Sequence, residues 1–436
     1  MVYVLGVHLS GLLGHQLLSP SGEGVGKVDD VIVRLHGDEY PPVTGLVAKV
    51  GGRQVFIPIS RVAELAEERI VLAKAKVDLR GFDRREGEVL LREDILGHRL
   101  IDVADAELVR AWDVELRATA DGWELSCLDT RRPARLFGLI RPTAGHPCQD
   151  WKAFEPLIGH TPSVTARASF GRVGKLKPAQ IADLLEDASR TEGEEILEVV
   201  HADPELEADV FEELDPDIAN RLFGDKTDGE VADVLAHMRA DDAADAVAEL
   251  PQHRRQKVLD LLPAGIRTKV LTLMGFNATS AGGIMGVDFL TVPTAASVDE
   301  ALRRVRLART VQPESLLTMH AVDDANRLIG TVSVIGLLQA DPESRMIDII
   351  DTDPVKVHAA TDVVDVTLLM ADYNLMTVPV VDVDDQLLGV ITVDDVLEAT
   401  IPDDWRRREP PAHPEPVYHP DSEPPSTNVE HSGQPG

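Results

Sequence analysis

A short helical period runs through the middle of this chain. From about residue 176 to 275, apolar side chains close successive units at spacings of 12 or 13 residues. Asp or Pro precedes several units, and both favour the first turn of a helix, where backbone N–H groups lack partners. Helices of two to three turns cannot bury an apolar face alone, so they must stack. The pattern predicts an α-helical superhelix over residues 176–275. The closing residues are Val210, Leu222, Leu235, Val247, Leu259 and Leu271.

The negative charge of the chain is concentrated on this helical segment. The 436 residues carry a formal net charge of -32 at pH 7. Residues 183–249 contain 23 acidic side chains against 4 Lys or Arg. Such a surface repels nucleic acid and attracts cations, so we expect no nucleic-acid partner. Two interpretations stay open: a solvated acidic face, or carboxylates that divalent cations screen.

The first segment repeats itself at a constant offset. LGHQL at residues 13–17 recurs as LGHRL at 96–100, and VDDVIVRL at 28–35 aligns with AWDVELRA at 111–118. Each block combines a glycine turn with a strand of alternating apolar residues. We therefore predict two small β-barrel halves within residues 1–140. The stretch LGHQLLSPSGEGVGKVDDVIV resembles the PRC-barrel family.

Two features of this first segment allow more than one interpretation. His15 and His98 occupy equivalent repeat positions and are either turn residues or metal ligands; the absence of acidic or cysteine partners at ligand spacing favours the turn. A basic cluster either docks an acidic neighbour or lies in a solvated linker, which we place at residues 141–175. The cluster consists of Arg131, Arg132, Arg135 and Arg141.

The third segment, residues 276–401, contains a second duplication. LIGTVSVIGLL at 328–338 matches LLGVITVDDVL at 387–397. Each copy has a buried strand that runs directly into a helix, which predicts an α/β unit. The segment resembles a CBS pair. In that family the pattern Gly-x-x-Thr/Ser-x-x-Asp closes a nucleotide pocket.

The second copy keeps this pattern whole as Gly389, Thr392 and Asp395. The first copy keeps the glycine and the hydroxyl but has Gly336 where the Asp belongs. A carboxylate can accept hydrogen bonds from both ribose hydroxyls, so this substitution matters. The resemblance implies one intact pocket for ATP or AMP, in the second copy.

The order of the segments resembles the cytosolic part of the MgtE magnesium-transporter family. The resemblance rests on the helical repeat, on NATSAGGIMGVDFLTV at residues 277–292 and on MADYNLMTVPVVDVDDQLLGVITVDDVLEA at residues 370–399. In that family the helical domain and the CBS pair bind several Mg2+ ions between them, and ion loss lets the region open. The resemblance implies a Mg2+ sensor that forms a homodimer through its CBS pair and acts on an unidentified protein partner, such as a membrane transporter.

The same resemblance places candidate Mg2+ ligands on the second CBS copy. Asp395 and Glu398 stand one helical turn apart on one face, with the carbonyl of Ala371 near them, and Asp362 adds a second cluster. Mg2+ takes few carboxylates plus waters. Asp395 is thus claimed by both the nucleotide and the metal hypotheses. Uncharged residues stand at two positions where the family has acids, Asn374 and Val364. Candidates for the opposing surface are Asp203, Asp215, Asp217, Asp241 and Asp242.

Several function classes are not expected. No GxSxG, HExxH or Walker motif is present, so we predict no enzymatic activity. Cys127 and Cys148 stand far from any CxxC or Cys/His spacing, which predicts neither a zinc site nor a disulfide and favours a reducing, cytoplasmic compartment. No apolar run approaches the ~18–20 residues of a membrane helix, so we expect no direct membrane insertion and no transport by these segments.

The sequence predicts a multidomain α+β fold. Small β-barrel domains precede an α-helical superhelix and an α/β CBS pair, and residues 402–436, rich in Pro, Glu, His and Ser, form a disordered tail. The leading functional hypothesis is a Mg2+ sensor that signals to a partner. The alternatives are a nucleotide-responsive CBS regulator with the acidic helices as a spacer, and a docking scaffold that binds neither ligand.

Overall fold

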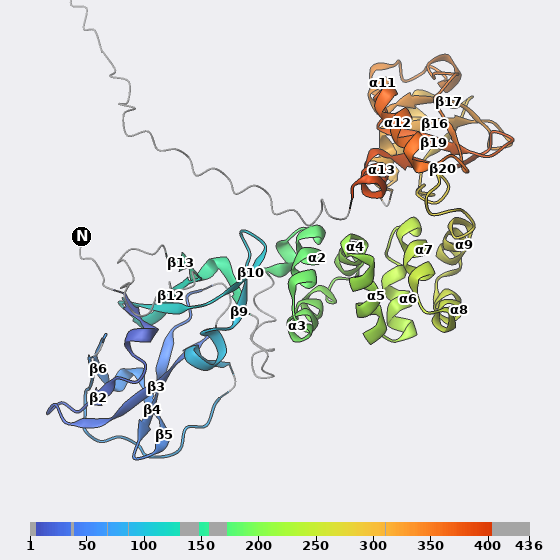
Figure 1. Ribbon diagram of the computed structural model, residues 1–436. Coiled ribbons are helices and arrows are strands. Elements are labelled where there is room, and N and C mark those ends of the chain that lie inside the picture. The colour runs from blue at the N-terminus through green and yellow to red at the C-terminus, as the bar shows by residue number, and fades with distance from the viewer. Residues whose placement is uncertain are drawn as a thin grey trace, which may run out of the picture. The chain divides into compact units, whose positions relative to one another are not determined.

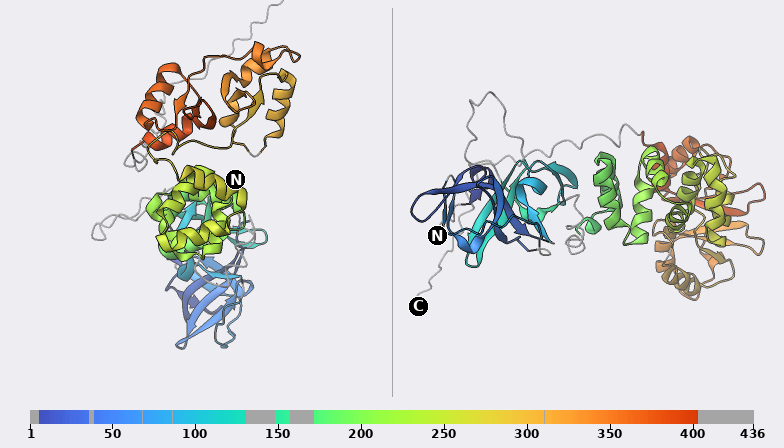
Figure 2. Two further views of the ribbon diagram at one scale, coloured as in Figure 1. Left: turned by 90° about the vertical axis from the view of Figure 1, so that its right-hand side faces the viewer. Right: turned by 90° about the horizontal axis from the view of Figure 1, so that it is seen from below.

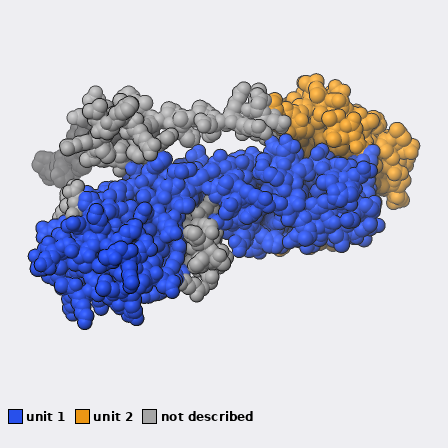
Figure 3. All heavy atoms as spheres, turned by 60° about the horizontal axis from the view of Figure 1, so that its bottom comes forward, with its two compact units in different colours: residues 1–275 blue, residues 276–436 orange. Residues whose placement is uncertain are grey.

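The computed structural model describes residues 6–35, 39–67, 69–85, 87–130, 148–156, 172–309 and 311–402. The chain divides into two compact units, residues 1–275 and 276–436 (Figure 3). The first unit contains a β-sheet region and the helical repeat, and the second contains the duplicated α/β segment (Figure 1). The predicted tail from residue 403 onward lies outside the described residues, as does the predicted basic cluster, Arg131, Arg132, Arg135 and Arg141.

The described residues of the N-terminal region form three sheets. The largest has the order β5-β4-β3-β2-β7-β6, with β8 on β3; the others are β1-β11-β12-β13 and β10-β9-β14. A barrel requires a closed ladder of strands, and the described strands form none, so the predicted barrels are not confirmed. The edge strands β5 and β6 follow each other in sequence, but the turn η2 separates them. The elements are β1 (Val7–His8), η1 (Leu9–Gly11), β2 (Gln16–Leu18), β3 (Gly24–Arg34), β4 (Val43–Val50), β5 (Arg53–Pro58), η2 (Ile59–Arg61), β6 (Val62–Ala66), β7 (Arg69–Leu72), β8 (Glu88–Leu90), η3 (Leu91–Ile95), β9 (Arg99–Asp102), β10 (Glu107–Arg110), β11 (Asp113–Thr119), β12 (Gly122–Asp129), β13 (Gln149–Asp150), η4 (Trp151–Ala153) and β14 (Phe154–Pro156).

The repeat in the first segment is confirmed as a repeated hydrogen-bonded turn. Gly14 has φ +78° and donates its N–H to the carbonyl of Val28 at 2.8 Å. Gly97 has φ +81° and donates to the carbonyl of Ala111 at 2.7 Å. Positive φ is the conformation that only glycine adopts without strain, which explains why the LGH motif keeps its glycine in both copies. His15 and His98 follow directly in these turns.

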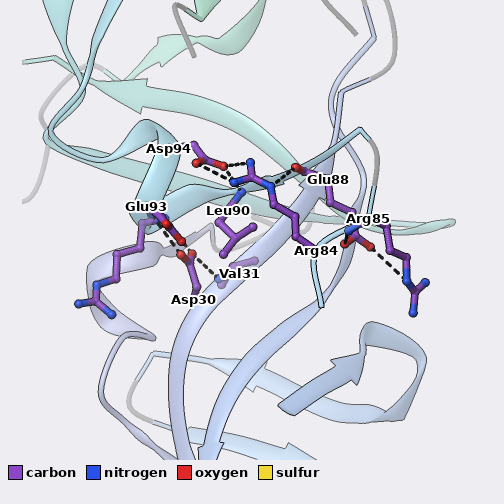
Figure 4. Close-up of polar contacts among 9 residues, drawn as sticks. Asp30, Val31, Arg84, Arg85, Glu88, Leu90, Glu93 and Asp94 are labelled. Atoms are coloured by element: carbon purple, nitrogen blue, oxygen red, sulfur yellow. Dashed lines mark hydrogen bonds and ion pairs between the residues drawn. The ribbon is translucent and has the colours of Figure 1, made fainter. Parts of the chain in front are cut away.

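The two halves interlock because each supplies a carboxylate that accepts backbone hydrogen bonds from a helical turn of the other half. Asp30 of the first half accepts hydrogen bonds from the backbone N–H of Arg92 at 2.8 Å and of Glu93 at 3.1 Å, in η3 of the second half (Figure 4). Asp113 of the second half accepts from the N–H of Ser10 at 3.1 Å, in η1 of the first half. Ser10 and Glu93 occupy equivalent positions of the two repeats, as do Asp30 and Asp113, so the exchange is reciprocal. Each half therefore completes the other.

The Asp30 carboxylate is buried and belongs to a compact polar network. Its side chain is almost inaccessible, and burial raises the pKa of Asp30 to about 6, although the backbone hydrogen bonds oppose this shift. Asp94, which raises the pKa further by charge repulsion, pairs with Arg84 and accepts from the N–H of Leu90 at 2.7 Å (Figure 4). The network fixes η3 and β8 against β3.

Cys127 and Cys148 form a disulfide, which contradicts the prediction that they would not pair. Their Cα atoms lie 5.6 Å apart because Cys148 immediately precedes β13, and β13 pairs with β12, which carries Cys127. Sequence spacing gave no sign of this because strand pairing, not a local motif, brings the two residues together. Because the two thiols are paired, the cysteines give no reason to expect a reducing compartment.

Strands β13 and β14 lie within the range predicted as linker, residues 141–175, and add to the sheets. Glu155 of β14 is buried and accepts hydrogen bonds from the N–H groups of Arg172 at 3.0 Å and Val173 at 3.1 Å. The Arg172 guanidinium donates to the carbonyl of Phe154 at 2.7 Å. These contacts anchor η5 (Val173–Lys175), the turn that leads into the helical repeat, on the β region.

The predicted helical repeat is confirmed. Eight helices occupy the fully described stretch 176–275, and successive helices begin 12 residues apart, with one interval of 14. Alternate helices stack, α2 on α4, α4 on α6 and α6 on α8 in one row and α5 on α7 and α7 on α9 in the other (Figure 1). The helices are α2 (Pro178–Asp187), α3 (Arg190–Val200), α4 (Pro204–Glu213), α5 (Pro216–Asp225), α6 (Asp228–Leu235), α7 (Ala240–Glu249), α8 (Gln252–Leu261) and α9 (Ala264–Leu273).

The second unit consists of two similar halves that lie side by side (Figure 2). Each half has a three-stranded sheet, β15-β16-β17 or β18-β19-β20, with one parallel and one antiparallel pair. The antiparallel registers coincide at equivalent positions of the two copies, as in Ala321↔Gly330 and Val380↔Gly389. The elements are β15 (Thr291–Pro293), α10 (Val298–Leu307), η6 (Ser315–Leu317), β16 (Thr318–Val322), β17 (Leu328–Ser333), α11 (Val334–Gln339), η7 (Met346–Asp348), β18 (Val357–His358), α12 (Val363–Tyr373), β19 (Thr377–Val381), β20 (Leu387–Thr392) and α13 (Val393–Thr400).

These two halves also exchange segments. The chain that enters the first half crosses the second, where Gly286 and Val390 exchange two backbone hydrogen bonds of 2.9 and 3.0 Å. The chain that enters the second half crosses the first, where Thr331 and Asp351 exchange bonds of 3.0 and 2.8 Å. Neither half is complete without a segment of the other.

We expect Asp30→Ala to destabilise the β region by about 3 kcal/mol, because it leaves backbone N–H groups of the η3 turn and Val31 without acceptors. Urea unfolding followed by tryptophan fluorescence reports on this region, since Trp112, Trp123 and Trp151 are three of the four tryptophans. The control is Glu64→Ala, which breaks an exposed ion pair with Arg69 and should cost less than about 1 kcal/mol. Equal losses for the two variants would contradict the interlocking role of Asp30.

Candidate ligand sites

Thr392 and Asp395 form a capping box at the start of α13. One carboxylate oxygen, Oδ2 of Asp395, accepts from the backbone N–H of Thr392 at 2.7 Å and from its hydroxyl at 2.9 Å. The N–H of Asp395 in turn donates to Thr392 Oγ1 at 3.3 Å. Both side chains are buried. The Thr-x-x-Asp part of the nucleotide motif therefore has a structural task, because it satisfies N–H groups at the helix start.

Gly389, the third member of that motif, is required by close packing. A Cβ atom at this position would lie 2.6 Å from Met285 Sδ and 2.9 Å from the carbonyl oxygen of Gly286. Gly330 in the first half is equally constrained, since a Cβ there would lie 2.3 Å from the carbonyl oxygen of Asp351. In each half the glycine admits the segment that crosses from the other half. The glycine pattern is thus explained without a nucleotide.

The candidate Mg2+ ligands occupy different surroundings. Glu398 is exposed on α13, one turn beyond the buried Asp395. Ala371 is exposed in the last turn of α12, and its carbonyl accepts from the N–H of Asn374 at 3.4 Å. Asp362 caps the opposite end of α12, where it accepts from the N–H of Val364 at 2.9 Å. At 1.5 Å per helical residue, Asp362 and Ala371 are separated by roughly 13 Å along the helix, so they belong to different sites.

The structure explains one of the two uncharged substitutions. Asn374 ends α12 with φ +52° and ψ +45°, the left-handed conformation that Asn tolerates better than most residues. It is therefore fitted to the helix end rather than to a cation. Val364 is an apolar residue that is 57% exposed in the first turn of α12, and the described contacts do not explain it.

The acids considered for the opposing surface stand at helix starts. Asp203 caps α4 and accepts from the N–H of Glu205 at 3.2 Å, and Asp215 caps α5 and accepts from the N–H of Asp217 at 3.0 Å. Asp241 and Asp242 lie in the first turn of α7. Carboxylates stabilise this end of a helix through its N–H groups and its dipole. Part of the acid in this segment thus has a local structural role.

A second group of acids on the same helices is electrostatically strained. Burial raises the pKa of Glu212 to about 7, with further repulsion from Asp209 and Asp241, although Arg239 donates its backbone N–H to Glu212. Burial and the charge of Glu205 also raise the pKa of Asp209. These groups lie on α4 and α7, where negative charge is crowded and partly withdrawn from water. A bound cation would relieve that repulsion.

Within the described residues, three ligand-type side chains converge at one place only, Glu115, Cys127 and Cys148 of the β region. The candidate acids of the helical repeat and of the α/β unit do not form such a group among themselves. Neither His15 nor His98 takes part in one. The Glu115 group was missed by sequence reasoning because it depends on strand register, which leaves no local motif. None of the described helices is long and apolar enough to cross a bilayer.

Comparisons with known proteins identify the class of two segments. Residues 176–279 match the MgtE intracellular N domain, and residues 347–401 match the CBS domain. The magnesium transporter MgtE of Thermus thermophilus is 36% identical over 161 residues, which cover 36% of this chain and 36% of that protein. The MgtE of Enterococcus faecalis is 30% identical over 130 residues, which cover 30% and 28%. The chain spans about a third of the length of these curated relatives.

Solved structures were also compared with the chain. The crystal structure of the soluble part of a magnesium transporter matches 54% of this chain and 90% of that one, with 24% identity and a TM-score of 0.49. The cytosolic domain of the Mg2+ channel MgtE in complex with ATP matches 52% and 91%, with 29% identity and a TM-score of 0.49. The matches of residues 176–279 and 347–401 confirm the predicted resemblance to MgtE cytosolic segments for the helical and CBS parts. The β region is not identified by these matches.

The raised pKa of Glu212 predicts a pH-dependent stability. The folded state holds the Glu212 proton more tightly than the unfolded chain does. Protonation of Glu212 therefore contributes fully to the free energy of unfolding below pH 4.5, and this contribution is lost as pH rises through about 7. Glu212→Gln should therefore gain stability relative to the wild type as pH rises between these values, by up to about 3 kcal/mol. Urea unfolding followed by far-ultraviolet circular dichroism at pH 4.5 and pH 8 measures this gain. The exposed Glu249→Gln controls for the loss of one charge, and an equal gain there contradicts the assignment.

Proposed function

We propose that this chain is a cytoplasmic, non-enzymatic regulatory protein that senses Mg2+ and transmits ion status to a protein partner. The observation that carries the proposal is the order of its parts. A segment that matches the MgtE intracellular N domain precedes one that matches the CBS domain, and the former carries 23 acidic residues against 4 basic ones in residues 183–249. Mg2+ bound between these two parts would hold them together, and ion loss would release them.

The electrostatics of the acidic helices support a divalent ligand. Burial raises the pKa values of Asp209 and Glu212, and repulsion from neighbouring carboxylates adds to it, so the charged form of both is disfavoured. A hard cation such as Mg2+ takes one or two carboxylates and keeps several waters. Such binding suits acids that already cap helices, because a water can bridge the ion to a carboxylate that retains its backbone hydrogen bonds. In the CBS-like part, Asp395, Glu398, the Ala371 carbonyl and Asp362 are the proposed contributors.

The β region is the proposed docking module. This proposal rests on the resemblance of its first copy to the PRC-barrel family. The relatives that match the helical and CBS parts are magnesium transporters, and this chain matches about a third of their length. We therefore propose that the partner is a membrane transporter. The β region would contact this protein, and it would bind neither nucleic acid nor lipid. The interlocked halves provide a rigid surface for such a contact.

A second copy of this chain is the proposed occupant of an apolar surface on the second unit. Pairs of exposed side chains at helical spacing project from three helices: Ile335 and Leu338 on α11, Val364 and Leu368 on α12, and Leu397 on α13 with Ile401 just beyond it. Spacings of three and four residues place each pair on one helix face. A two-fold homodimer buries the same surface on both copies, so these exposed apolar residues would pack on their counterparts in the second copy.

We expect Mg2+ to compact and stabilise the chain more than NaCl at matched ionic strength. Binding to the native state contributes about 1.4 kcal/mol at ten times the dissociation constant. Thermal melts and small-angle scattering from 0 to ~20 mM Mg2+ measure both effects, and this range brackets millimolar carboxylate sites. Asp395→Asn keeps an acceptor for Thr392 but removes the charge, and Glu398→Gln removes an exposed one. Both should weaken the Mg2+ response.

The matched control is Glu343→Gln, which removes an exposed charge from the first half of the second unit. It should leave the Mg2+ response unchanged. An equal response to NaCl would mean that the charge is merely screened, and the Mg2+ proposal fails. In Mg2+-free buffer, stabilisation by ATP or AMP that is lost in Asp395→Ala would instead support the nucleotide-responsive alternative at Gly389, Thr392 and Asp395. No response to any of these ligands leaves the docking scaffold.

Charged substitutions on α12 test whether the exposed apolar residues of the second unit form a dimer interface. Val364→Glu with Leu368→Glu places two carboxylates on the exposed face of α12 and should shift the protein from dimer to monomer, because like charges would meet across the two-fold axis. Analytical ultracentrifugation reports the mass directly. The control is Val383→Glu in the β19–β20 turn, which is 92% exposed and lies outside the proposed surface. A double variant that remains dimeric, or a wild type that is monomeric, overturns the assignment.

A further inference from the structure

A row of metal-binding side-chain types crosses the four-stranded sheet of the β region. Strand register places His8 opposite Glu115, Glu115 opposite Cys127, and Cys127 opposite Asp150. Directly paired residues project from the same face of a sheet, and neighbouring strands lie about 4.8 Å apart. Cys148 immediately precedes β13 and reaches the same row. Three separate stretches of chain therefore deliver ligands to one place.

The centre of this row is compact. The two sulfurs and a carboxylate oxygen of Glu115 all lie within 4.8 Å of one another, and all three residues are half-buried. Two thiolates and one carboxylate form a donor set for Zn2+ or a similar borderline-soft cation. Mg2+ prefers an all-oxygen octahedral shell, so this site differs in kind from the acidic helices. The chemistry of the side chains selects the ion.

The Glu115 carboxyl is held in position by its surroundings. It packs against the backbone of Gly6, where a Cβ atom would lie 2.0 Å from Glu115 Oε1. The register shifts after the Glu115–Cys127 pair because β12 carries an extra residue there, Ser126, which donates its hydroxyl to the Glu115 carbonyl at 3.0 Å. Bulges often redirect a side chain beside a functional site. His8 is engaged elsewhere, since its Nδ1 lies 2.9 Å from Glu67 Oε1.

We infer that Glu115, Cys127 and Cys148 form a redox-gated site for a zinc-type divalent cation. The site is closed while the two sulfurs are joined as a disulfide. A dithiol reductant transfers two electrons and two protons to the S–S bond, giving two protein thiols and a cyclic disulfide of the reductant. Cation binding then displaces two thiol protons, and Glu115 supplies the third ligand, with water in the fourth position.

The backbone geometry suits both states of the thiol pair. The Cα atoms of Cys127 and Cys148 lie 5.6 Å apart. In a tetrahedral site with Zn–S bonds of about 2.3 Å, the two sulfurs stand about 3.8 Å apart. Rotation about the cysteine side-chain bonds would change the sulfur separation from one state to the other. Cys127 and Cys148 would thus be linked either directly by the disulfide or through a bound cation.

The test uses Co2+ as a spectroscopic substitute for Zn2+ on the full chain. After reduction and anaerobic removal of the reductant, the wild type should show two reactive thiols and bind one Co2+. Binding should produce thiolate-to-cobalt charge-transfer absorption, release two protons, persist in excess Mg2+ and be reversed by Zn2+. The oxidised protein should show neither thiols nor the absorption band. This comparison uses one and the same chain, so it does not depend on a variant that folds.

Variants identify the ligands. Cys127→Ser with Cys148→Ser should abolish the charge-transfer band. Gly6→Ala, which displaces the Glu115 carboxyl without changing a ligand, should weaken Co2+ binding by about tenfold, and Glu115→Gln should weaken it further. The control is Glu124→Gln on β12, whose carboxylate pairs with Arg117 and which should bind Co2+ as the wild type does. The inference is overturned if reduced wild type with two titratable thiols gives no band, or if the oxidised protein or the double serine variant binds equally.

Discussion

Carboxylates that accept hydrogen bonds from backbone N–H groups hold the joints of this chain. Asp30 and Asp113 each cap a helical turn of the other half of the β region. Glu155 does the same for the turn that leads into the helical repeat. Asp203 caps the start of a helix within that repeat, and Asp395 completes the capping box of α13 in the second unit. An ionised acceptor gives a stronger hydrogen bond than a neutral one, and a buried N–H without an acceptor costs free energy. Part of the acidic composition is therefore explained by carboxylates that cap helices and turns.

This arrangement leaves a surplus of charge that capping does not explain. Glu212 and Asp209 start no helix but lie within α4, and burial raises the pKa values of both. Neighbouring acids add to the shifts: Asp209 and Asp241 act on Glu212, and Glu205 and Asp203 act on Asp209. Arg239 pairs with Glu212 and also with Asp242 at the start of α7. The acids that cap no helix therefore add to the negative charge on which the proposed Mg2+ binding depends.

Periodicity predicted the organisation of the fold, while long-range register decided the details. The recurrences in the first, the helical and the third segments each correspond to a repeated structural unit, because a repeat in sequence reproduces local hydrogen bonding, as at Gly14 and Gly97. Barrel closure, the Cys127–Cys148 disulfide and the position of Glu115 depend on which strands pair, and short apolar strands carry no signal of their partners. For the candidate site, too, the sequence predicted the local element but not its tertiary surroundings. The helix that carries Asp395 and Glu398 was predicted, but their contrast in burial was not.

The pattern shared by Gly389, Thr392 and Asp395 shows why a binding motif can be present without establishing a ligand. Each of its members has a structural task here: the glycine admits the segment at Met285, and the other two cap a helix. A ligand that drew Asp395 away from Thr392 would leave two buried donors unpaired, at a cost of about 1–3 kcal/mol each. Binding must therefore proceed with the cap intact. A metal-bound water and a ribose hydroxyl both meet this condition, because each donates a hydrogen to a carboxylate that can accept several. The cap at Thr392 therefore has to persist in any complex formed at Asp395, whether the ligand is Mg2+ or a nucleotide.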